Sequence, residues 1–456
     1  MKRPAPSSDP ATPAKPTEQA EDPSPSSRRR FLSGGMMLAG GALVGNNLSV
    51  ARGAHAFGTD IIKVGLVGCG ARGTRAAAHA LQTADALSGE VQLTALADVL
   101  PSNVQAAYRS IKGQAAARVD VQDRRFVGFD GFRKLMETDI DVVILSTPPA
   151  FRPQHFEAAV EAGKHVFMEK PIATDAPGVR RVLATNISAK QQNLAVHVGL
   201  QRRHELRYRE CIDRLHSGEI GDLLFARAYW NAGRGKAQTR KAGQTELEFQ
   251  MRNWGSFTWL GGDHINEHHI HNLDVINWLV QNHPIQARGQ GSRQTLTGRV
   301  PGQVFDQHMI EFTYPGGFKL FSQCRLAQGC WNNIGEHAHG SKGTADISNA
   351  LIRDAAGKKL WHSDTKELKG QGLQQEFRDL FAGLRTGQPC NEADYAATST
   401  MTAILGRMAS YSGRVVEWDD AMTCPNQLAD VDSLTSFDDP APVQPDANGN
   451  YPHQQA

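Results

Sequence analysis

Four short apolar runs alternate with helically spaced segments in the first part of the chain. The runs cover residues 61–67, 91–97, 141–146 and 165–168, and the helical segments cover 74–87 and 154–162. Short apolar runs that end at turn residues are typical of strands buried on both faces. Strands that alternate with helices favour a parallel sheet built from βαβ units.

The hydrophobic pattern changes after residue 220. Gly and Pro now bound apolar or alternating runs, at 224–230, 286–290, 305–314 and 317–324, which favours antiparallel strands. Two later segments, 374–385 and 396–410, have helical periodicity. From Pro425 the composition turns to Asp, Pro, Gln and Asn, which predicts either a wrapping arm or a loose tail. The chain is therefore expected to have an α/β fold with two different sheets.

Composition narrows the class of protein. The 456 residues are 40% hydrophobic and carry a formal net charge of only +2, so we expect a soluble protein of two or three domains with no nucleic-acid partner. The six cysteines include no CxxC pair and no Cys/His spacing suited to structural zinc; they are Cys69, Cys211, Cys324, Cys330, Cys390 and Cys424.

The N-terminus has the features of an export signal. Residues 1–27 are rich in Pro, Ser and Ala, and Ser27-Arg28-Arg29-Arg30-Phe31-Leu32 precedes a weakly apolar segment that ends at Ala54-His55-Ala56. This arrangement resembles a twin-arginine signal with cleavage near Ala56. The expected location is periplasmic or otherwise exported, with the twin-arginine machinery as a partner and no stable membrane insertion. Because no dinucleotide pool exists there, we expect any nucleotide cofactor to travel tightly bound and to be recycled in place.

A glycine-rich turn follows the first predicted strand. Gly68-Cys69-Gly70-Ala71-Arg72-Gly73 leads into a helical segment, and the second strand ends at Asp98. This order of strand, G-x-G-x-x-G, helix, strand and acid is the dinucleotide-binding fingerprint. Asp98 favours NAD because its carboxylate can bond the adenosine ribose hydroxyls, whereas Arg72, Arg75 and Arg109 leave NADP possible.

Further segments resemble the Gfo/Idh/MocA oxidoreductases, the family of glucose-fructose oxidoreductase and inositol dehydrogenase. The matching segments are the glycine fingerprint, Thr147-Pro148, Ala162–Pro171, Val198–Arg203 and Gly218–Gly221. The resemblance implies a Rossmann domain, then an α/β domain with an open, mainly antiparallel sheet that often mediates oligomerisation. A homo-oligomer, either a dimer or a tetramer, is therefore expected. The resemblance also implies that Lys170, in Glu169-Lys170-Pro171, lies near nicotinamide and substrate.

These observations give a predicted domain plan and a predicted set of cofactor contacts. The plan is a leader over 1–56, a Rossmann domain over 57–172, a substrate and oligomerisation domain over 173–424, and an arm or tail over 425–456. The predicted cofactor-binding residues are Gly68, Gly70, Ala71, Arg72, Gly73, Asp98, Thr147, Pro148, Glu169 and Lys170.

The segment from Trp259 to Asp274 is rich in histidine. On one continuous helix, His264, Glu267, His268 and His271 would share a face that points into a site. The resemblance places the catalytic histidine at His271 and puts Glu267 where the family has aspartate. The alternative is a divalent metal held by His264, His268 and another residue, although we predict no metal.

The predicted reaction is hydride transfer from a sugar or polyol. His271 is expected to act as acid/base, Lys170 to stabilise the alkoxide, and Glu267 to orient His271 or a substrate hydroxyl. Arg203, Trp254 and His268 are the predicted substrate contacts. Two alternatives stay open: NAD-assisted cleavage of a glycoside through transient oxidation at C3, and a non-catalytic sugar-binding protein.

Overall fold

The computed structural model describes residues 61–83, 89–233, 237–296, 302–365 and 371–452. The predicted twin-arginine signal and its cleavage site near Ala56 lie outside these ranges. Within them, no helix is both long enough and apolar enough to cross a membrane.

The N-terminal part of the described chain forms a parallel sheet in the strand order β3-β2-β1-β4-β5-β6. Its strands are β1 (Ile62–Val67), β2 (Val91–Asp98), β3 (Arg125–Val127), β4 (Val142–Leu145), β5 (His165–Met168) and β6 (Val196–Val198). The helices between them are α1 (Ala71–Thr83), α2 (Pro101–Ala115), α3 (Gly131–Met136), α4 (Arg152–Glu161) and α5 (Ala176–Gln191). The predicted boundary at residue 172 is wrong, because β6 pairs with β5 and extends this domain to about residue 198.

The second sheet has the order β14-β13-β12-β11-β7-β10-β9-β8-β15. All its pairings among the described residues are antiparallel except that of β10 with β7. Its strands are β7 (Leu223–Ala232), β8 (Gln286–Ser292), β9 (Gln307–Thr313), β10 (Lys319–Leu326), β11 (Asn333–Gly340), β12 (Gly343–Asp346), β13 (Leu351–Asp354), β14 (Lys359–His362) and β15 (Val416–Glu417). The mainly antiparallel second domain is thus confirmed.

The sequence prediction missed several strands of the second sheet, and β11 is the one of these that pairs with β7. The glycines and histidines of residues 335–340 predict a loop between strands, but these residues belong to β11, which lies between β7 and β12. The alternation of apolar and polar residues fails at Glu336, because this charged residue takes an inward position and its carboxylate is fully buried. The guanidinium of Arg202 pairs with that carboxylate, and the Asn272 amide donates to it, so a charge can occupy an inward position.

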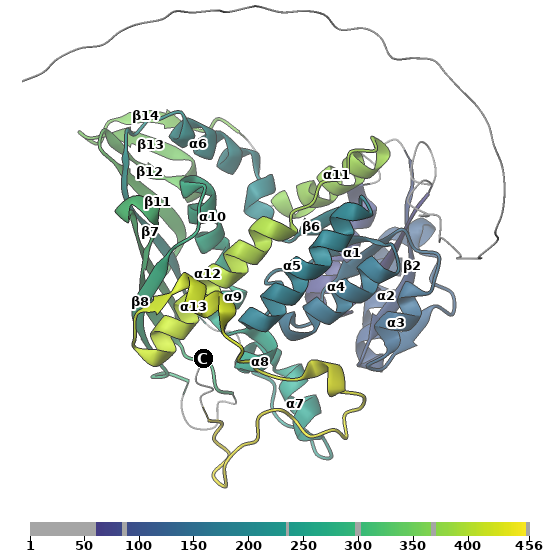
Figure 1. Ribbon diagram of the computed structural model, residues 1–456. Helices are drawn as coiled ribbons and strands as arrows, with labels where there is room; N and C mark the ends of the chain where they lie inside the picture. Colours follow the sequence, from purple (N-terminus) through teal and green to yellow (C-terminus); the bar gives the residue numbers. More distant parts are fainter. Residues whose placement is uncertain (1–60, 84–88, 234–236, 297–301, 366–370, 453–456) are drawn as a thin grey trace, which may run out of the picture. The chain divides into compact units, whose positions relative to one another are not determined.

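Helices join the two sheets. The long helix α12 (Ala393–Ser412) packs against both α5 and β8, so it lies between the parallel and the mixed sheet (Figure 1). α11 (Gly372–Arg385) returns to the first domain, where Phe377 stacks on Phe167 of β5. The remaining helices are α6 (Leu206–His216), α7 (Glu246–Arg252), α8 (Thr258–Gly261), α9 (His264–Glu267), α10 (Ile270–Val280) and α13 (Trp418–Thr423).

Candidate active site

The glycine turn between β1 and α1 has the geometry that the fingerprint predicts. Gly68 has φ of +95°, and a Cβ there would lie 2.5 Å from the Ser146 carbonyl carbon. A Cβ on Gly73 would lie 1.9 Å from the Gly68 oxygen, so α1 packs directly on the turn. Gly70, in contrast, has open space beside it. The turn is therefore tight on the protein side and open where a pyrophosphate would approach.

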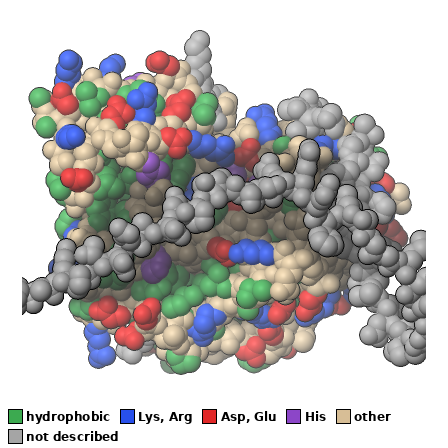
Figure 2. Space-filling view, turned by 45° about the horizontal axis from the view of Figure 1, so that its top comes forward, with side chains coloured by type: hydrophobic (Ala, Val, Ile, Leu, Met, Phe, Trp, Pro, Cys, Tyr) green, Lys and Arg blue, Asp and Glu red, His purple; other side chains and the backbone are tan. Residues whose placement is uncertain are grey.

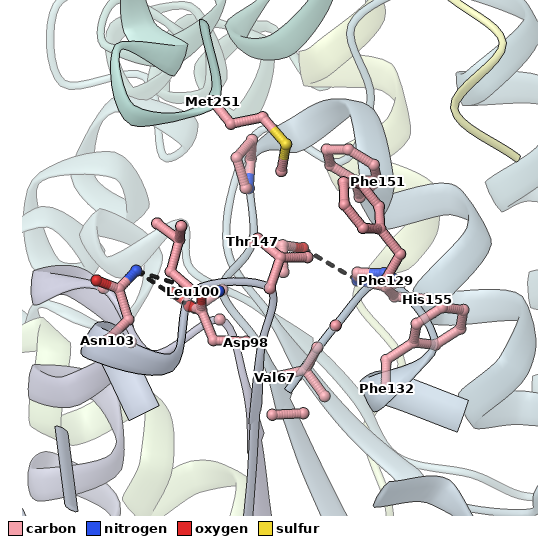
Figure 3. A pocket seen from close by; sticks show the side chains of 18 of the residues that line it. Val67, Asp98, Leu100, Asn103, Phe129, Phe132, Thr147, Phe151, His155 and Met251 are labelled. Atoms are coloured by element: carbon pink, nitrogen blue, oxygen red, sulfur yellow. Dashed lines mark hydrogen bonds between the residues drawn. The ribbon is translucent and has the colours of Figure 1, made fainter. Parts of the chain in front are cut away.

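A cavity of about 810 Å³ opens from this turn. Its volume suits a dinucleotide, and Figure 3 shows side chains of both polar and aromatic character around it. The predicted cofactor residues that line it are Gly68, Gly70, Ala71, Arg72, Gly73, Asp98, Thr147 and Pro148. Glu169 and Lys170 lie just outside this lining set.

Asp98 ends β2 and links the cavity to the glycine turn. Its carboxylate accepts hydrogen bonds from the backbone N–H groups of Cys69 (2.7 Å) and Leu100 (2.8 Å). Asn103 donates to the same group at 3.3 Å (Figure 3). Burial raises the pKa of Asp98 above its ordinary value, while these hydrogen bonds oppose the rise. The carboxylate is thus fixed at the place where a ribose would lie.

Much of the cavity wall was not predicted from the sequence. Three aromatic side chains, Phe129, Phe132 and Phe151, form an apolar side of the cavity, and Met251 approaches from α7 (Figure 3). Trp254, predicted to contact substrate, instead lines this cofactor cavity. No local motif marks these positions, because the chain brings them together only through the tertiary fold.

The C-terminal segment supplies the rest of the wall. Val431, Asp432, Leu434 and Thr435 line the cavity although they lie more than 300 residues from the glycine turn. We call residues 425–452 the C-terminal arm. The open alternative between an arm and a loose tail is therefore decided in favour of an arm.

The arm is attached at both of its ends. Near its start, the Leu428 N–H donates to Asp175 Oδ2 at 2.9 Å. Arg181 pairs with Asp432 at 2.7 Å. Further on, Gln250 of α7 donates to the Val443 carbonyl at 2.5 Å, and the Tyr451 hydroxyl donates to a carboxylate oxygen of α7 at 2.8 Å. The arm thus joins the Rossmann helix α5 to α7 and runs along the cavity.

Lys170 lies next to the cavity because adjacent parallel strands end together. Leu145 of β4 pairs with Met168 of β5, so the Thr147 turn and Lys170 leave the sheet at one edge. Arg152 ties them together, since its guanidinium donates to the carbonyls of both Thr147 and Pro171. Lys170 thus follows β5 at the same sheet edge as Thr147 and Pro148, which line the cavity.

Glu169 and Arg72 form an ion pair at this edge. Arg72 Nε donates to Glu169 Oε1 at 2.6 Å, and a second carboxylate, that of Glu376 in α11, lies 3.5 Å from Arg72 Nη2. Glu169 is almost fully buried. These predicted cofactor contacts therefore hold each other in the structure, and the pair fixes the strand end that carries Lys170.

Lys170 and Glu267 form an ion pair that the sequence did not predict. Lys170 Nζ donates to the Glu267 backbone carbonyl and lies 3.2 Å from Glu267 Oε1. The other carboxylate oxygen, Oε2, lies 2.6 Å from His268 Nδ1. Burial raises the pKa of Glu267, but the charge of Lys170 and the contact with His268 outweigh it and hold the pKa below its ordinary value. The carboxylate is therefore charged and positioned between two nitrogen groups.

His271 lies in the first turn of α10 and is buried. Its ring stacks on Trp230 with centroids 6.1 Å apart, and its Nδ1 atom is buried without a hydrogen-bond partner. Burial lowers the pKa of His271 well below its ordinary value, and the positive charges of Lys170 and Arg202 lower it further. His271 is thus a neutral imidazole close to a lysine, as a proton acceptor needs to be.

The predicted single helical face is wrong for His264. The chain turns at His268 and His269, so α9 ends at Glu267 and α10 starts at Ile270. His264 is directed instead toward His308, with ring centroids 4.8 Å apart. Glu267, His268 and His271 remain together around Lys170 and Trp230, whereas His264 lies in a different environment.

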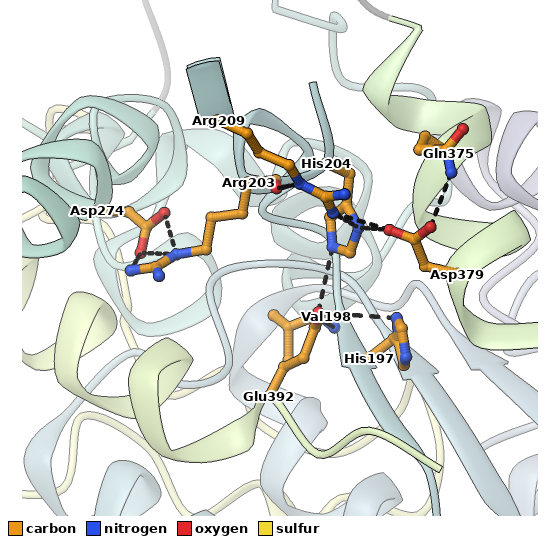
Figure 4. A network of polar contacts seen from close by, with 9 residues as sticks. All are labelled: His197, Val198, Arg203, His204, Arg209, Asp274, Gln375, Asp379 and Glu392. Atoms are coloured by element: carbon orange, nitrogen blue, oxygen red, sulfur yellow. Dashed lines mark hydrogen bonds and ion pairs between the residues drawn. The ribbon is translucent and has the colours of Figure 1, made fainter. Parts of the chain in front are cut away.

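Arg203 belongs to a neighbouring polar network. Its guanidinium donates twice to the Asp274 carboxylate and lies over the Tyr395 ring, 4.0 Å from the centroid. Figure 4 shows the pair beside His204, which contacts both Asp379 and Glu392. Arg203, predicted to contact substrate, therefore binds the carboxylate three residues after His271 and supports α10.

One face of the molecule is hollowed, and histidine side chains gather along the hollow (Figure 2). The His268 side chain is 42% exposed and can contact a ligand from solvent. The side chains of Lys170 and Glu267 are only 12% and 20% exposed. An open imidazole beside a covered ion pair suits a small polar substrate that reaches the pair from solvent.

The comparison with known proteins agrees with this geometry. A model of the Gfo/Idh/MocA oxidoreductase family, described by its NAD-binding Rossmann fold, matches residues 62–200. Inositol 2-dehydrogenase from Salmonella typhimurium (strain LT2) is 25% identical over 371 residues, which cover 78% of this chain and 97% of that protein. The same-named protein from Acidiphilium cryptum is 26% identical over 334 residues, covering 72% and 87%.

Solved structures share the fold. Scyllo-inositol dehydrogenase from Lactobacillus casei, with bound NAD(H) and scyllo-inositol, has a TM-score of 0.59 and 20% identity, covering 79% of this chain and all of that one, 100%. Aldose-aldose oxidoreductase from Caulobacter crescentus has a TM-score of 0.61 and 17% identity, covering 78% and 100%. Both contain the two-domain arrangement within which the cavity and Lys170 lie.

Proposed function

We propose that this chain is an exported, NAD-dependent oxidoreductase of the Gfo/Idh/MocA family. It oxidises a CH–OH group of a sugar or cyclic polyol outside the cytoplasm. The observation that carries the proposal is the Lys170–Glu267 ion pair, next to the neutral His271 and at the edge of the dinucleotide cavity. The inositol dehydrogenases named above support the class of substrate.

The residues divide the chemistry between them. Bound in the cavity, NAD would accept hydride from the carbinol carbon. His271 takes the hydroxyl proton, because its lowered pKa leaves the ring unprotonated beforehand and its Nδ1 has no competing partner. Lys170 donates a hydrogen bond to the developing alkoxide, and Glu267 holds the ammonium in place.

Retention of the cofactor is the second part of the proposal. The C-terminal arm lines the cavity with Val431 and Leu434, both nearly buried. Such a wall slows escape of a bound dinucleotide, as an exported enzyme without a nucleotide pool requires. The leader motif Ser27-Arg28-Arg29 supports export. We therefore propose a closed cycle in which a second carbonyl substrate takes the hydride back, a cycle that the name of the aldose-aldose oxidoreductase also suggests.

The test is to express the full chain in a bacterium and recover it from the periplasmic fraction. Nucleotide released by denaturation is expected to be NAD or NADH at about one per chain, and the protein should interconvert pairs of sugars or polyols without added cofactor. A chain with Arg28→Lys and Arg29→Lys is expected to stay in the cytoplasm with its nucleotide bound.

Three results separate the alternatives. Release of an aglycone from a glycoside would replace the oxidoreductase by the redox-neutral cleavage reaction. Bound NAD with no turnover of any sugar, polyol or glycoside would indicate a sugar-binding protein. Turnover that occurs only with millimolar external NAD would refute the closed cycle.

The outer face of the second sheet supports self-association, and we propose a homo-oligomer. Two apolar side chains are exposed on adjacent strands of this face, namely Met309 of β9 (51%) and Phe321 of β10 (41%). Light scattering of the full chain is expected to give a dimer or tetramer. The pair Met309→Lys and Phe321→Lys should shift it to monomer, because lysines on both strands oppose burial of the face. A monomeric wild-type protein would refute the proposal.

A further inference from the structure

Three side chains of types that bind metal ions come together where α9 meets the mixed sheet. His264 starts α9, His308 belongs to β9, and Cys324 belongs to β10. The strands pair with His308 directly opposite Cys324. One ligand atom from each of the three residues lies within 4.8 Å of the others, and the residues are 2%, 3% and 1% exposed. The sheet register and α9 together hold two imidazoles and a thiol in the protein interior.

The two imidazoles are oriented like metal ligands. His264 Nδ1 bonds Asp263 Oδ1 at 2.9 Å, and His308 Nδ1 bonds the Ser410 hydroxyl at 2.8 Å. The opposite nitrogens, both Nε2, are buried without a hydrogen-bond partner. A buried ring nitrogen without a partner is costly, whereas a ligating histidine commonly bonds a carboxylate or another oxygen through its second nitrogen.

Asp263 provides an oxygen at the same place. Its Oδ2 lies 3.4 Å from His308 Nε2 and accepts the Tyr411 hydroxyl at 2.6 Å and the Phe305 N–H at 3.0 Å. Asp263 also has φ of +73°, in the left-handed region that favours glycine. The surrounding structure therefore holds this carboxylate against the two histidines at a conformational cost.

We propose that His264, His308 and Cys324 bind one zinc ion through Nε2, Nε2 and Sγ, with Asp263 Oδ2 completing or supporting the site. Two imidazoles and a thiolate form a donor set that zinc prefers, and zinc takes a fourth ligand to complete a tetrahedron. Around zinc, ligand atoms lie roughly 3.3–3.8 Å apart. The three ligand atoms here lie within 4.8 Å of one another, so a small shift of the side chains toward the ion brings them to this separation. The thiol loses its proton to solvent when the ion binds.

The ion would affect the reaction indirectly, because it would hold Glu267 in place. His264 lies three residues before Glu267 on α9, and Glu267 contacts Lys170 through both its backbone carbonyl and its side chain. A bond from His264 through the ion to β9 and β10 anchors α9 to the mixed sheet. The ion is therefore a positioning element for Glu267 and does not touch the substrate.

The sequence could not indicate this site. The three ligands are separated by 44 and 16 positions, at residues 264, 308 and 324, and no CxxC or short Cys/His spacing links them. The predicted absence of a zinc site rested on spacing alone. The alternative raised by the sequence, a metal ion held by His264 and His268, differs from this proposal, because His268 contacts Glu267 instead.

Elemental analysis of the full chain, purified with a tag that contains no histidine, tests the proposal. The wild-type protein is expected to contain about one zinc per chain, and Cys324→Ser to contain almost none. Cys211→Ser is the matched control, because Cys211 is also a fully buried cysteine and lies outside the cluster. It should keep its zinc. Bound NAD, measured on the same samples, reports that the Rossmann domain is folded.

Replacement of zinc by cobalt supplies a measurement that does not depend on a variant. Cobalt-loaded wild-type protein is expected to show a thiolate-to-cobalt charge-transfer band and tetrahedral d–d bands, and Cys211→Ser should show the same spectrum. If Cys324→Ser fails to fold, this spectrum and the His308→Gln variant decide. Wild-type protein that retains NAD but binds neither zinc nor cobalt would overturn the proposal, as would zinc retained by soluble Cys324→Ser.

Discussion

Replacement of Lys170 by methionine is expected to lower turnover by about a thousandfold while NAD stays bound. Lys170 Nζ is the ammonium that faces Glu267, and methionine keeps a similar length without a donor or a charge. The cofactor cavity is lined by other residues, so nucleotide content should change little. Turnover per bound nucleotide, measured on wild-type and variant protein with the same substrate pair, checks this result.

The same variant should also change the pH dependence. Burial is the main cause of the depressed pKa of His271, and the charge of Lys170 adds to it. Without that charge, the pKa of His271 rises toward its ordinary value, so the imidazole becomes protonated at higher pH. Because the reaction needs the neutral ring, the acid limb of the residual activity should move to higher pH in Lys170→Met.

Lys170→Arg is the control, since it keeps the charge next to His271. Its turnover is expected to fall, because the planar guanidinium cannot reproduce the ammonium geometry, but its acid limb should stay near that of the wild-type protein. Equal turnover in wild type and Lys170→Met would remove Lys170 from the mechanism. An acid limb that moves equally in the Arg and Met variants would show that charge does not set it.

The parts of the site that depend on local sequence were predictable. Gly68, Gly70 and Gly73 each have a different steric environment, and the spacing of the fingerprint already encodes those three requirements. Asp98 follows because it ends the next strand of the same unit. Lys170 follows from the segment that resembles the family. In each case, the residues of the motif and the contacts that require them lie within the same short segment of the chain.

Features that depend on distant partners were not predictable. His264 and Glu267 do share helix α9, but the chain turns at His268 before α10 carries His271, and His264 is directed toward His308 of β9. Glu336 concealed an inner strand because the charge that neutralises it comes from Arg202. Sequence periodicity reports which face of an element is polar, but it does not report which other element will supply the partner.

The C-terminal arm was the least predictable part of the site, and its role leads to the second large effect. The polar composition of the arm did not distinguish an arm from a tail, because its buried apolar residues lack periodicity; they include Leu428, Val431, Leu434, Ala441 and Val443. A chain that ends at Cys424 is expected to lose bound NAD at least about tenfold faster, which corresponds to about 1.4 kcal/mol. Nucleotide retained during dialysis, and its displacement by labelled NAD, measure the change.

Two leucines of the arm separate contact with the cofactor from packing of the arm. Leu434 lines the cavity and Leu428 does not, yet both are 9% exposed and belong to one apolar cluster. Truncation to alanine removes the same buried atoms at each position. Leu434→Ala should therefore speed NAD loss, whereas Leu428→Ala should lower the melting temperature similarly but affect NAD less. Equal NAD loss in both variants would mean that the arm acts through stability alone, and unchanged retention in the chain ending at Cys424 would mean that it does not hold the cofactor.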